Sequence, residues 1–169
     1  MHLTGKERVM KDNDVIVSKT NLKGHITYAN DIFCELADYT VSEVMNQPHN
    51  MVRHPDMPRC VFKLLWDYIS DGKEIFAYVV NRAKNGDHYW VLAHVTPSFD
   101  SEGNIVGYHS NRRKPKQSAV DAIAKVYKIL LTEEKKYENR KEGQKAGFDL
   151  LISILEEKGI TYDEFILSI

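Results

Sequence analysis

The chain has 169 residues, of which 43% are apolar and 28% charged, and this composition argues against a disordered chain, a collagen-like repeat and a disulfide scaffold. Its 23 basic and 24 acidic residues give a formal net charge of −1, so no strong field draws nucleic acid or an anionic membrane. The two cysteines, Cys34 and Cys60, lack metal-ligand spacing, which fits a reducing compartment.

Membrane and export signals are also missing from the sequence. No stretch approaches the ~20 apolar residues that span a bilayer, and the first 14 residues contain no apolar core of a signal peptide. We therefore expect a cytoplasmic chain without direct membrane insertion. Any position at the periphery of the inner membrane would depend on a protein partner.

The first part of the chain alternates short strands with short helices. Residues 15–28 read as a hairpin of two strands around an Asn-Leu-Lys-Gly turn. Asn30 is placed to cap a short helix, and Thr40 with Glu43 forms a capping box for a second one. These signals predict two helices directly after the hairpin.

A proline-rich loop over residues 47–58 precedes a longer helix. Pro58 suits the first position of that helix, and apolar residues recur at helical spacing from Val61 to Ile69. Gly72 is placed to end it. The spacing predicts one buried helix face, which is more often core than a cofactor contact.

Three strands follow the helix, over residues 75–84, 88–99 and 105–111. Asn85-Gly86 joins the first two as a tight hairpin turn. Hairpin strands, short helices and three further antiparallel strands indicate an α+β domain that ends near residue 114.

The remainder of the sequence predicts helices. Apolar residues recur at helical spacing over 119–131 and again over 148–155, and the second pattern stops near Gly159. Thr161 and Glu164 form a capping box for a last helix. The C-terminal helices should be amphipathic.

The loop sequence from Pro48 to Pro58, PHNMVRHPDMP, resembles the corresponding loop of Aer-type PAS domains. The resemblance extends over residues 14–113 through Asn30, Tyr39-Thr40, Asn81-Arg82, the run from Lys84 to Trp90, and Gly107-Tyr108. It implies a PAS fold, with a five-stranded antiparallel sheet, short helices on one face and C-terminal amphipathic helices. The implied division is an N-terminal cap segment (1–13), a PAS sensory domain (14–114) and a helical extension (115–169) for signalling, dimerisation or partner docking.

Aer-type PAS domains bind FAD noncovalently and relay its redox state to a chemotaxis transducer. The resemblance therefore implies a cytoplasmic sensor for redox state and energy taxis, rather than an enzyme, that contacts a membrane-bound chemotaxis transducer. In layout the chain is most similar to the small soluble CetB-like energy-taxis sensors. A homodimer formed through the N-terminal cap or the C-terminal helices is a further expectation.

The resemblance also implies which residues bind the flavin. By position, Arg53, His54 and Asp56 match flavin-binding positions of the family loop, and Trp90 matches a tryptophan that faces the cofactor. Arg53 and His54 can supply partners for a diphosphate. Because neighbouring side chains of a strand face opposite ways, only Tyr89 or Trp90 can lie on the concave face, and we predict Trp90 for ring stacking.

Two asparagines complete the predicted cofactor site. Asn81 can hydrogen-bond a flavin edge, although a strand asparagine can equally face water. Asn30 matches the family and is predicted both to contact the cofactor and to cap a helix. For Asp56 an alternative is a turn that fixes the loop without touching a ligand.

The same residues also bear on other functions. His88 and His94 share a strand face but lie roughly 20 Å apart along it, too far to bind one metal ion. A single histidine could still ligate haem, so a haem or small-ligand sensor and a cofactor-free interaction module stay open. The reactive cysteine of photochemical PAS domains aligns with His49, which argues against light-driven adduct chemistry. The sequence contains no nucleophile elbow, phosphate loop or dinucleotide fingerprint that would indicate an enzyme.

Overall fold

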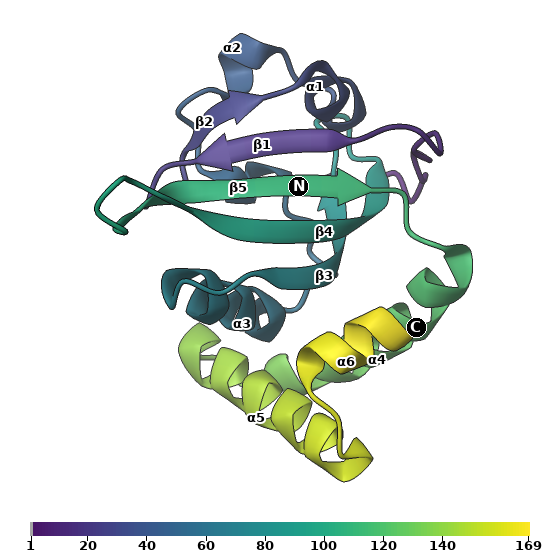
Figure 1. The fold of residues 1–169 in the computed structure, drawn as a ribbon. Coiled ribbons are helices and arrows are strands. Elements are labelled where there is room, and N and C mark those ends of the chain that lie inside the picture. The colour runs from purple at the N-terminus through teal and green to yellow at the C-terminus, as the bar shows by residue number, and fades with distance from the viewer. Residues whose placement is uncertain (1) are drawn as a thin grey trace.

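The computed structural model describes residues 2–169 and contains a five-stranded antiparallel sheet in the order β2-β1-β5-β4-β3 (Figure 1). The strands are β1 (Ile16–Thr20), β2 (Ile26–Ala29), β3 (Ile75–Arg82), β4 (His88–Phe99) and β5 (Ile105–Arg113). The helices are α1 (Asp31–Ala37), α2 (Val41–Val44), the 3-10 helix η1 (His49–Val52), α3 (Arg59–Ser70), α4 (Gln117–Glu134), α5 (Arg140–Lys158) and α6 (Tyr162–Ser168). The predicted α+β class and its five-stranded sheet are confirmed.

Local capping signals define where most of the helices begin. The Asn30 side chain accepts a hydrogen bond from the Phe33 amide at the start of α1, and capping boxes at Thr40 and Thr161 start α2 and α6. Pro58 precedes α3 instead of beginning it, because its ψ of 141° is extended. Pro58 also offers no side-chain cap, so the first amides of α3 need acceptors from elsewhere in the chain.

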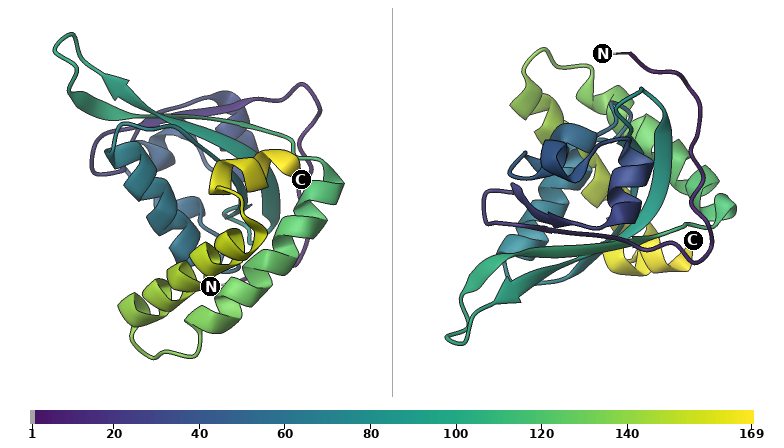
Figure 2. Two further views of the ribbon diagram at one scale, coloured as in Figure 1. Left: turned by 60° about the horizontal axis from the view of Figure 1, so that its bottom comes forward. Right: turned by 90° about the horizontal axis from the view of Figure 1, so that it is seen from above.

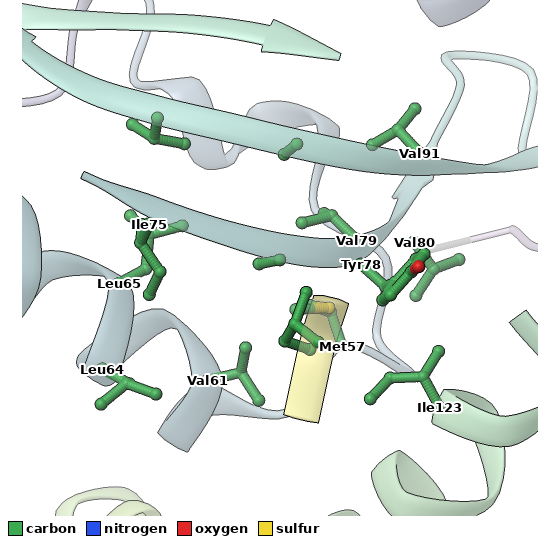
Figure 3. Packing of buried hydrophobic residues seen from close by; sticks show 14 of the residues in the cluster. Met57, Val61, Leu64, Leu65, Ile75, Tyr78, Val79, Val80, Val91 and Ile123 are labelled. Carbon is green, nitrogen blue, oxygen red and sulfur yellow. The ribbon is translucent and has the colours of Figure 1, made fainter. Parts of the chain in front are cut away.

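The pairing of β3 with β4 determines which side chains share a face of the sheet. Asn81 pairs with Tyr89 and Val79 with Val91, so these residues point to one side. Figure 3 shows Val79 on the side of β3 opposite Tyr78, Val80 and the α4 residue Ile123. The sheet therefore has an inner face toward α3 and η1, and an outer face toward the C-terminal helices.

The C-terminal helices pass around the β3 edge of the sheet (Figures 1 and 2). On the outer face, the Tyr127 hydroxyl of α4 donates to the Tyr78 carbonyl over 2.5 Å, and α6 also packs against β3. Helix α5 turns back and packs against α3 on the other side of that edge. Among residues 2–169, no helix combines the length and apolar character needed to cross a membrane.

The N-terminal residues form a strap along the β3–β4 hairpin. The Thr4 amide donates to the Gly86 carbonyl over 3.0 Å, and the Arg8 amide donates to the His88 carbonyl over 2.7 Å. The buried Asp87 accepts from the hydroxyl of Thr4 and from Nε of Arg8. These bonds explain how a mostly exposed segment is held in place.

Candidate ligand-binding site

A cavity of about 330 Å³ lies between the inner face of the sheet, η1 and α3. Its walls are mainly apolar side chains from α3, β3 and β4: Phe62, Leu65, Ile69, Val79, Ala93 and Val95. Polar residues also line it, among them Ser18, His49, Arg53, Asn81, Ser110 and Arg112. An apolar slot with a few convergent polar groups is the usual form of a small-molecule site.

Arg112 carries a positive charge into the cavity wall. Its side chain is buried, and its Nη2 atom donates to Oγ of Ser18 over 2.9 Å and to Nε2 of His49 over 2.7 Å. Both partners are neutral, and no carboxylate of residues 2–169 forms an ion pair with it. Burial lowers the pKa of Arg112 to about 10, which leaves the guanidinium charged at neutral pH. This uncompensated buried cation favours an anionic or electron-rich ligand beside it.

His49 is held in its neutral form by the same contacts. Arginine has no acceptor atom, so Nε2 of His49 must accept the hydrogen bond from Arg112. Burial and the neighbouring Arg112 charge lower the pKa of His49 to about 3. At neutral pH this histidine orients Arg112 without adding a second positive charge.

Two further polar residues, Ser110 and Asn81, lie in the cavity wall. Oγ of Ser110 is fully buried and has no hydrogen-bond partner among the described residues. The Asn81 side chain is also buried, and its position is fixed because its backbone forms a bridge to Arg53. An unpaired buried hydroxyl is costly, and a polar ligand edge in the cavity would satisfy that of Ser110.

Arg53 and Asn81 are the two predicted residues that line the cavity. The Arg53 guanidinium lies 4.5 Å from the centre of the Phe62 ring, and its Nη2 donates to the Met57 carbonyl over 3.0 Å. Burial lowers its pKa. The side chain is therefore braced against α3, with part of its guanidinium left for other partners.

His54 and Asp56 lie outside the cavity. Nδ1 of the buried His54 accepts a hydrogen bond from the Asp56 amide over 3.1 Å, and its ring packs beside His88. The Asp56 side chain is 72% exposed. These contacts shape the loop that precedes α3, which matches the structural alternative considered for Asp56 more closely than ligand contact.

The prediction that Trp90 lies on the concave face is wrong. Trp90 pairs with Val80 on the outer face, where its ring stacks on Tyr127 of α4 with 6.1 Å between centroids. Tyr89 is the neighbour that faces inward, and it is buried. The cofactor contact predicted for Asn30 also does not fit, because its amide binds the backbone of Val15, Val17 and Phe33 outside the cavity.

Sequence reasoning missed the residues at the polar end of the cavity. Arg112 lies at the basic end of the predicted domain and His49 in the proline-rich loop, and neither is a predicted site residue. Strand alternation was the available signal, because Tyr108, Ser110 and Arg112 share one face of β5. That alternation would have placed a charged residue at an inward position.

A protein-family model described as PAS fold matches residues 26–112 of the chain. This range includes the cavity residues of η1, α3, β3, β4 and β5. The chain belongs to the PAS-fold family. This PAS chain is 41% identical over 129 residues to the aerotaxis receptor of Escherichia coli strain K12, a match that covers 76% of the chain and 25% of the receptor. The resemblance to Aer-type PAS domains is thus confirmed.

A second relative of the PAS chain is the nitrogen fixation regulatory protein of Klebsiella pneumoniae. The two are 25% identical over 105 residues, which is 62% of this chain and 21% of the relative. The PAS chain therefore spans about a quarter or less of the length of these two relatives.

Solved structures with the same fold include light-oxygen-voltage domains. One, from work on a flavin analogue, matches with a TM-score of 0.58 and 22% identity over 68% of this chain and 86% of that domain. The light-state structure of the Aureochrome1 blue-light photoreceptor domain matches with a TM-score of 0.56 and 25% identity. The match covers 72% of this chain and 91% of that domain. Neither Cys34 nor Cys60 of the PAS chain lines the cavity.

Proposed function

We propose that this PAS chain binds FAD noncovalently in the cavity and acts as a redox sensor for energy taxis. The observation that carries the proposal is the buried Arg112 guanidinium, which enters the cavity wall with only neutral partners. An isoalloxazine ring has flat apolar faces for the walls and a polar edge that gains negative charge on reduction. When bound, such a ring supplies reversible electron uptake.

The chain's own residues divide into those that hold the ring edge and those that reach the remainder of the cofactor. Arg112, oriented by Ser18 and His49, favours negative charge at the edge, and Asn81 can donate and accept there. A volume of about 330 Å³ is at the low end for ligand sites, which suits the ring better than a whole dinucleotide. Arg53 provides a cation for a diphosphate, and Lys63, whose ammonium pairs with Asp67 over 2.6 Å, borders the same cavity.

The signalling part of the proposal draws on the relatives. The relative with 41% identity is an aerotaxis receptor, so the same chemistry in this chain supports energy taxis. We propose a cytoplasmic protein without catalytic activity that passes the flavin redox state to a membrane-bound chemotaxis transducer. The helices α4 to α6 are the proposed contact for that transducer or for a second copy of the chain.

A haem sensor is less well supported by the same geometry. An axial haem ligand needs a free histidine nitrogen that faces the cofactor. In the cavity, Nε2 of His49 already accepts from Arg112 over 2.7 Å. His109 also borders the cavity, but it alternates with Ser110 and Arg112 along β5, so its ring faces the other side of the sheet, and His54 does not line the cavity.

An equilibrium titration tests the binding proposal. The purified full chain, stripped of any cofactor, is titrated with FAD, FMN and hemin, and binding is followed by flavin fluorescence or haem absorbance. We expect saturable flavin binding with one FAD per chain and weaker FMN binding, because FMN lacks the second phosphate. Saturable hemin binding with no flavin binding would overturn the proposal.

A further inference from the structure

Helix α5 reaches the cavity although it lies outside the residues that the PAS model matches. Gln144 of α5 lines the cavity, and its Nε2 donates to the Arg59 carbonyl at the start of α3 over 3.2 Å. Helix α3 in turn contributes Phe62, Leu65 and Ile69 to the same cavity. One wall of the site is therefore attached to the C-terminal hairpin of α4 and α5.

Glu134, the last residue of α4, makes the second attachment. Its side chain is 4% exposed, and its two carboxylate oxygens accept from the Cys60 amide over 2.8 Å and from the Arg59 amide over 3.1 Å. Pro58 leaves the start of α3 without a side-chain cap of its own. A carboxylate from 74 residues away thus caps this helix, and the positive end of the helix dipole favours its charge.

The packing around Glu134 leaves little tolerance for movement. A Cβ atom added at Gly147 of α5 would lie 2.8 Å from Cγ of Glu134 and 3.3 Å from Sγ of Cys60. A Cβ atom at Gly143 would collide with the Glu134 backbone. The two glycines therefore allow α5, α4 and the first turn of α3 to meet closely. Because such packing has no room for small displacements, a shift of α3 must be shared by α5 or must break the contact.

We propose that the α4–α5 hairpin regulates the cavity: docking of Glu134 and Gln144 on the first turn of α3 and flavin binding stabilise each other. The inference rests on the proposed function, because the ligand is taken to be FAD. The docked hairpin completes the cavity wall, so a bound ring strengthens docking, and by thermodynamic reciprocity docking strengthens binding. A change in the ligand is then read out as a change in how firmly the hairpin is held.

Hydrogen–deuterium exchange of the full chain with and without saturating FAD tests this coupling. The observed regions are the amides of Arg59 and Cys60 and those of α5. We expect FAD to slow exchange in α5 at least threefold. If one FAD binds to each chain but α5 exchanges at the same rate with and without it, the inference is wrong while the proposed function stands. If FAD does not bind, both are wrong.

Glu134→Gln and Glu138→Gln form a matched pair of variants. Each removes one negative charge, but Glu138 is exposed in the loop between α4 and α5. We expect Glu134→Gln to weaken FAD binding by about fivefold or more, in the usual range of coupling between sites, and to abolish the effect of FAD on α5. Glu138→Gln should match the wild type. Equal FAD affinity and equal α5 protection in the two variants would contradict the inference.

Gln144→Ala provides a second route if Glu134→Gln fails to fold. It removes a half-buried side chain and one hydrogen bond but no buried charge. Protection of α5 by FAD should fall to less than half of the wild-type effect. Full protection in this variant would contradict a role for Gln144 and leave the cavity wall independent of α5.

Discussion

Arg112 is the residue on which the chemistry of the cavity depends. A buried cation without a carboxylate is costly when no ligand is bound, because its desolvation is repaid only in part by Ser18, His49 and the Phe33 ring 5.8 Å away. A ligand with negative charge at that position lowers the cost. The same buried charge therefore destabilises the protein without a ligand and raises the affinity for a negatively charged one.

Arg112→Met and Arg113→Met separate a site charge from a surface charge. Both remove one cation, but Arg113 is exposed and points away from the cavity. We expect Arg112→Met to weaken FAD binding about 10- to 100-fold, the equivalent of the ~1.5–3 kcal/mol of a charged hydrogen bond. Arg113→Met should stay within about twofold of wild type. Fluorescence titration of both variants makes the comparison, and equal affinities would remove Arg112 from the site.

His49 should make the free energy of unfolding depend on pH. Its pKa is lowered from 6.5 to about 3 in the folded protein, so between these values the unfolded chain carries a proton on this ring and the folded chain does not. The folded state therefore loses stability as pH falls through this window, by at most ~1.4 kcal/mol per pH unit. Urea unfolding at pH 7, 6 and 5 measures the slope.

The His49→Asn variant isolates this contribution from those of other titrating groups. Asparagine retains an acceptor for Arg112 but does not titrate, so the loss of stability on acidification should be smaller than in wild type. Identical slopes for wild type and His49→Asn would show that the ring does titrate freely.

Replacing Trp90 with alanine should mainly reduce stability, whereas replacing Trp66 with alanine should mainly weaken FAD binding. Trp90 stacks on Tyr127 outside the cavity, whereas Trp66 lines it and is 37% exposed. We expect Trp90→Ala to cost about 2 kcal/mol of unfolding free energy while FAD affinity stays within about threefold. Trp66→Ala should weaken FAD binding with a smaller loss of stability. Loss of FAD binding in a fully stable Trp90→Ala protein would restore the original prediction for that residue.

The contact between α5 and Glu134 makes a specific prediction for Gly147. Glycine to alanine in a helix normally stabilises by up to ~1 kcal/mol, but here the added methyl meets Cγ of Glu134 at 2.8 Å. We expect Gly147→Ala to destabilise the protein by about 1–3 kcal/mol through overpacking. Ser153→Ala, at an exposed position of the same helix, should be neutral or stabilising. Thermal or urea unfolding distinguishes the two, and a stabilised Gly147→Ala would mean that the hairpin is loosely packed.

Elements with local signals were predictable from the sequence, and contacts across the fold were not. Caps at Asn30, Thr40 and Thr161 depend on neighbouring residues, so the helices they start were found. The start of α5 was missed, because its first turns carry charged residues and glycines and no apolar stripe. Asn139 caps this start, and the segment is joined to α3 by its packing on Glu134 and by the bond from Gln144 to the Arg59 carbonyl, which no spacing rule predicts.

Strand β4 shows why the site was only partly predictable. One face of this strand is buried under α3 and the other is half-buried, with Trp90 packed on Tyr127 of α4, so large apolar residues occur in both alternation sets. The sequence therefore could not decide between Tyr89 and Trp90, and the pairing of Asn81 with Tyr89 does. Arg112 was hidden for a different reason, because charged residues are almost never buried and a run of basic residues reads as surface.

Taken as a whole, the molecule is a PAS sheet with a cavity on one face and a helical hairpin around one edge (Figure 2). The cavity and the hairpin share α3, which gives a ligand a physical route to the C-terminal helices. Those helices are the proposed surface for the chemotaxis transducer. A sensor of this design needs no catalytic residue, since all that changes is the charge of the ligand and the docking of an element.

The visible absorption spectrum of the chain, purified from cells without added cofactor, tests the central claim most directly. The account predicts the two absorption bands of a flavin, their bleaching on reduction, and release of FAD into solution when the protein is unfolded, since binding is noncovalent. A Soret band, or a colourless protein that takes up no added FAD, would contradict it.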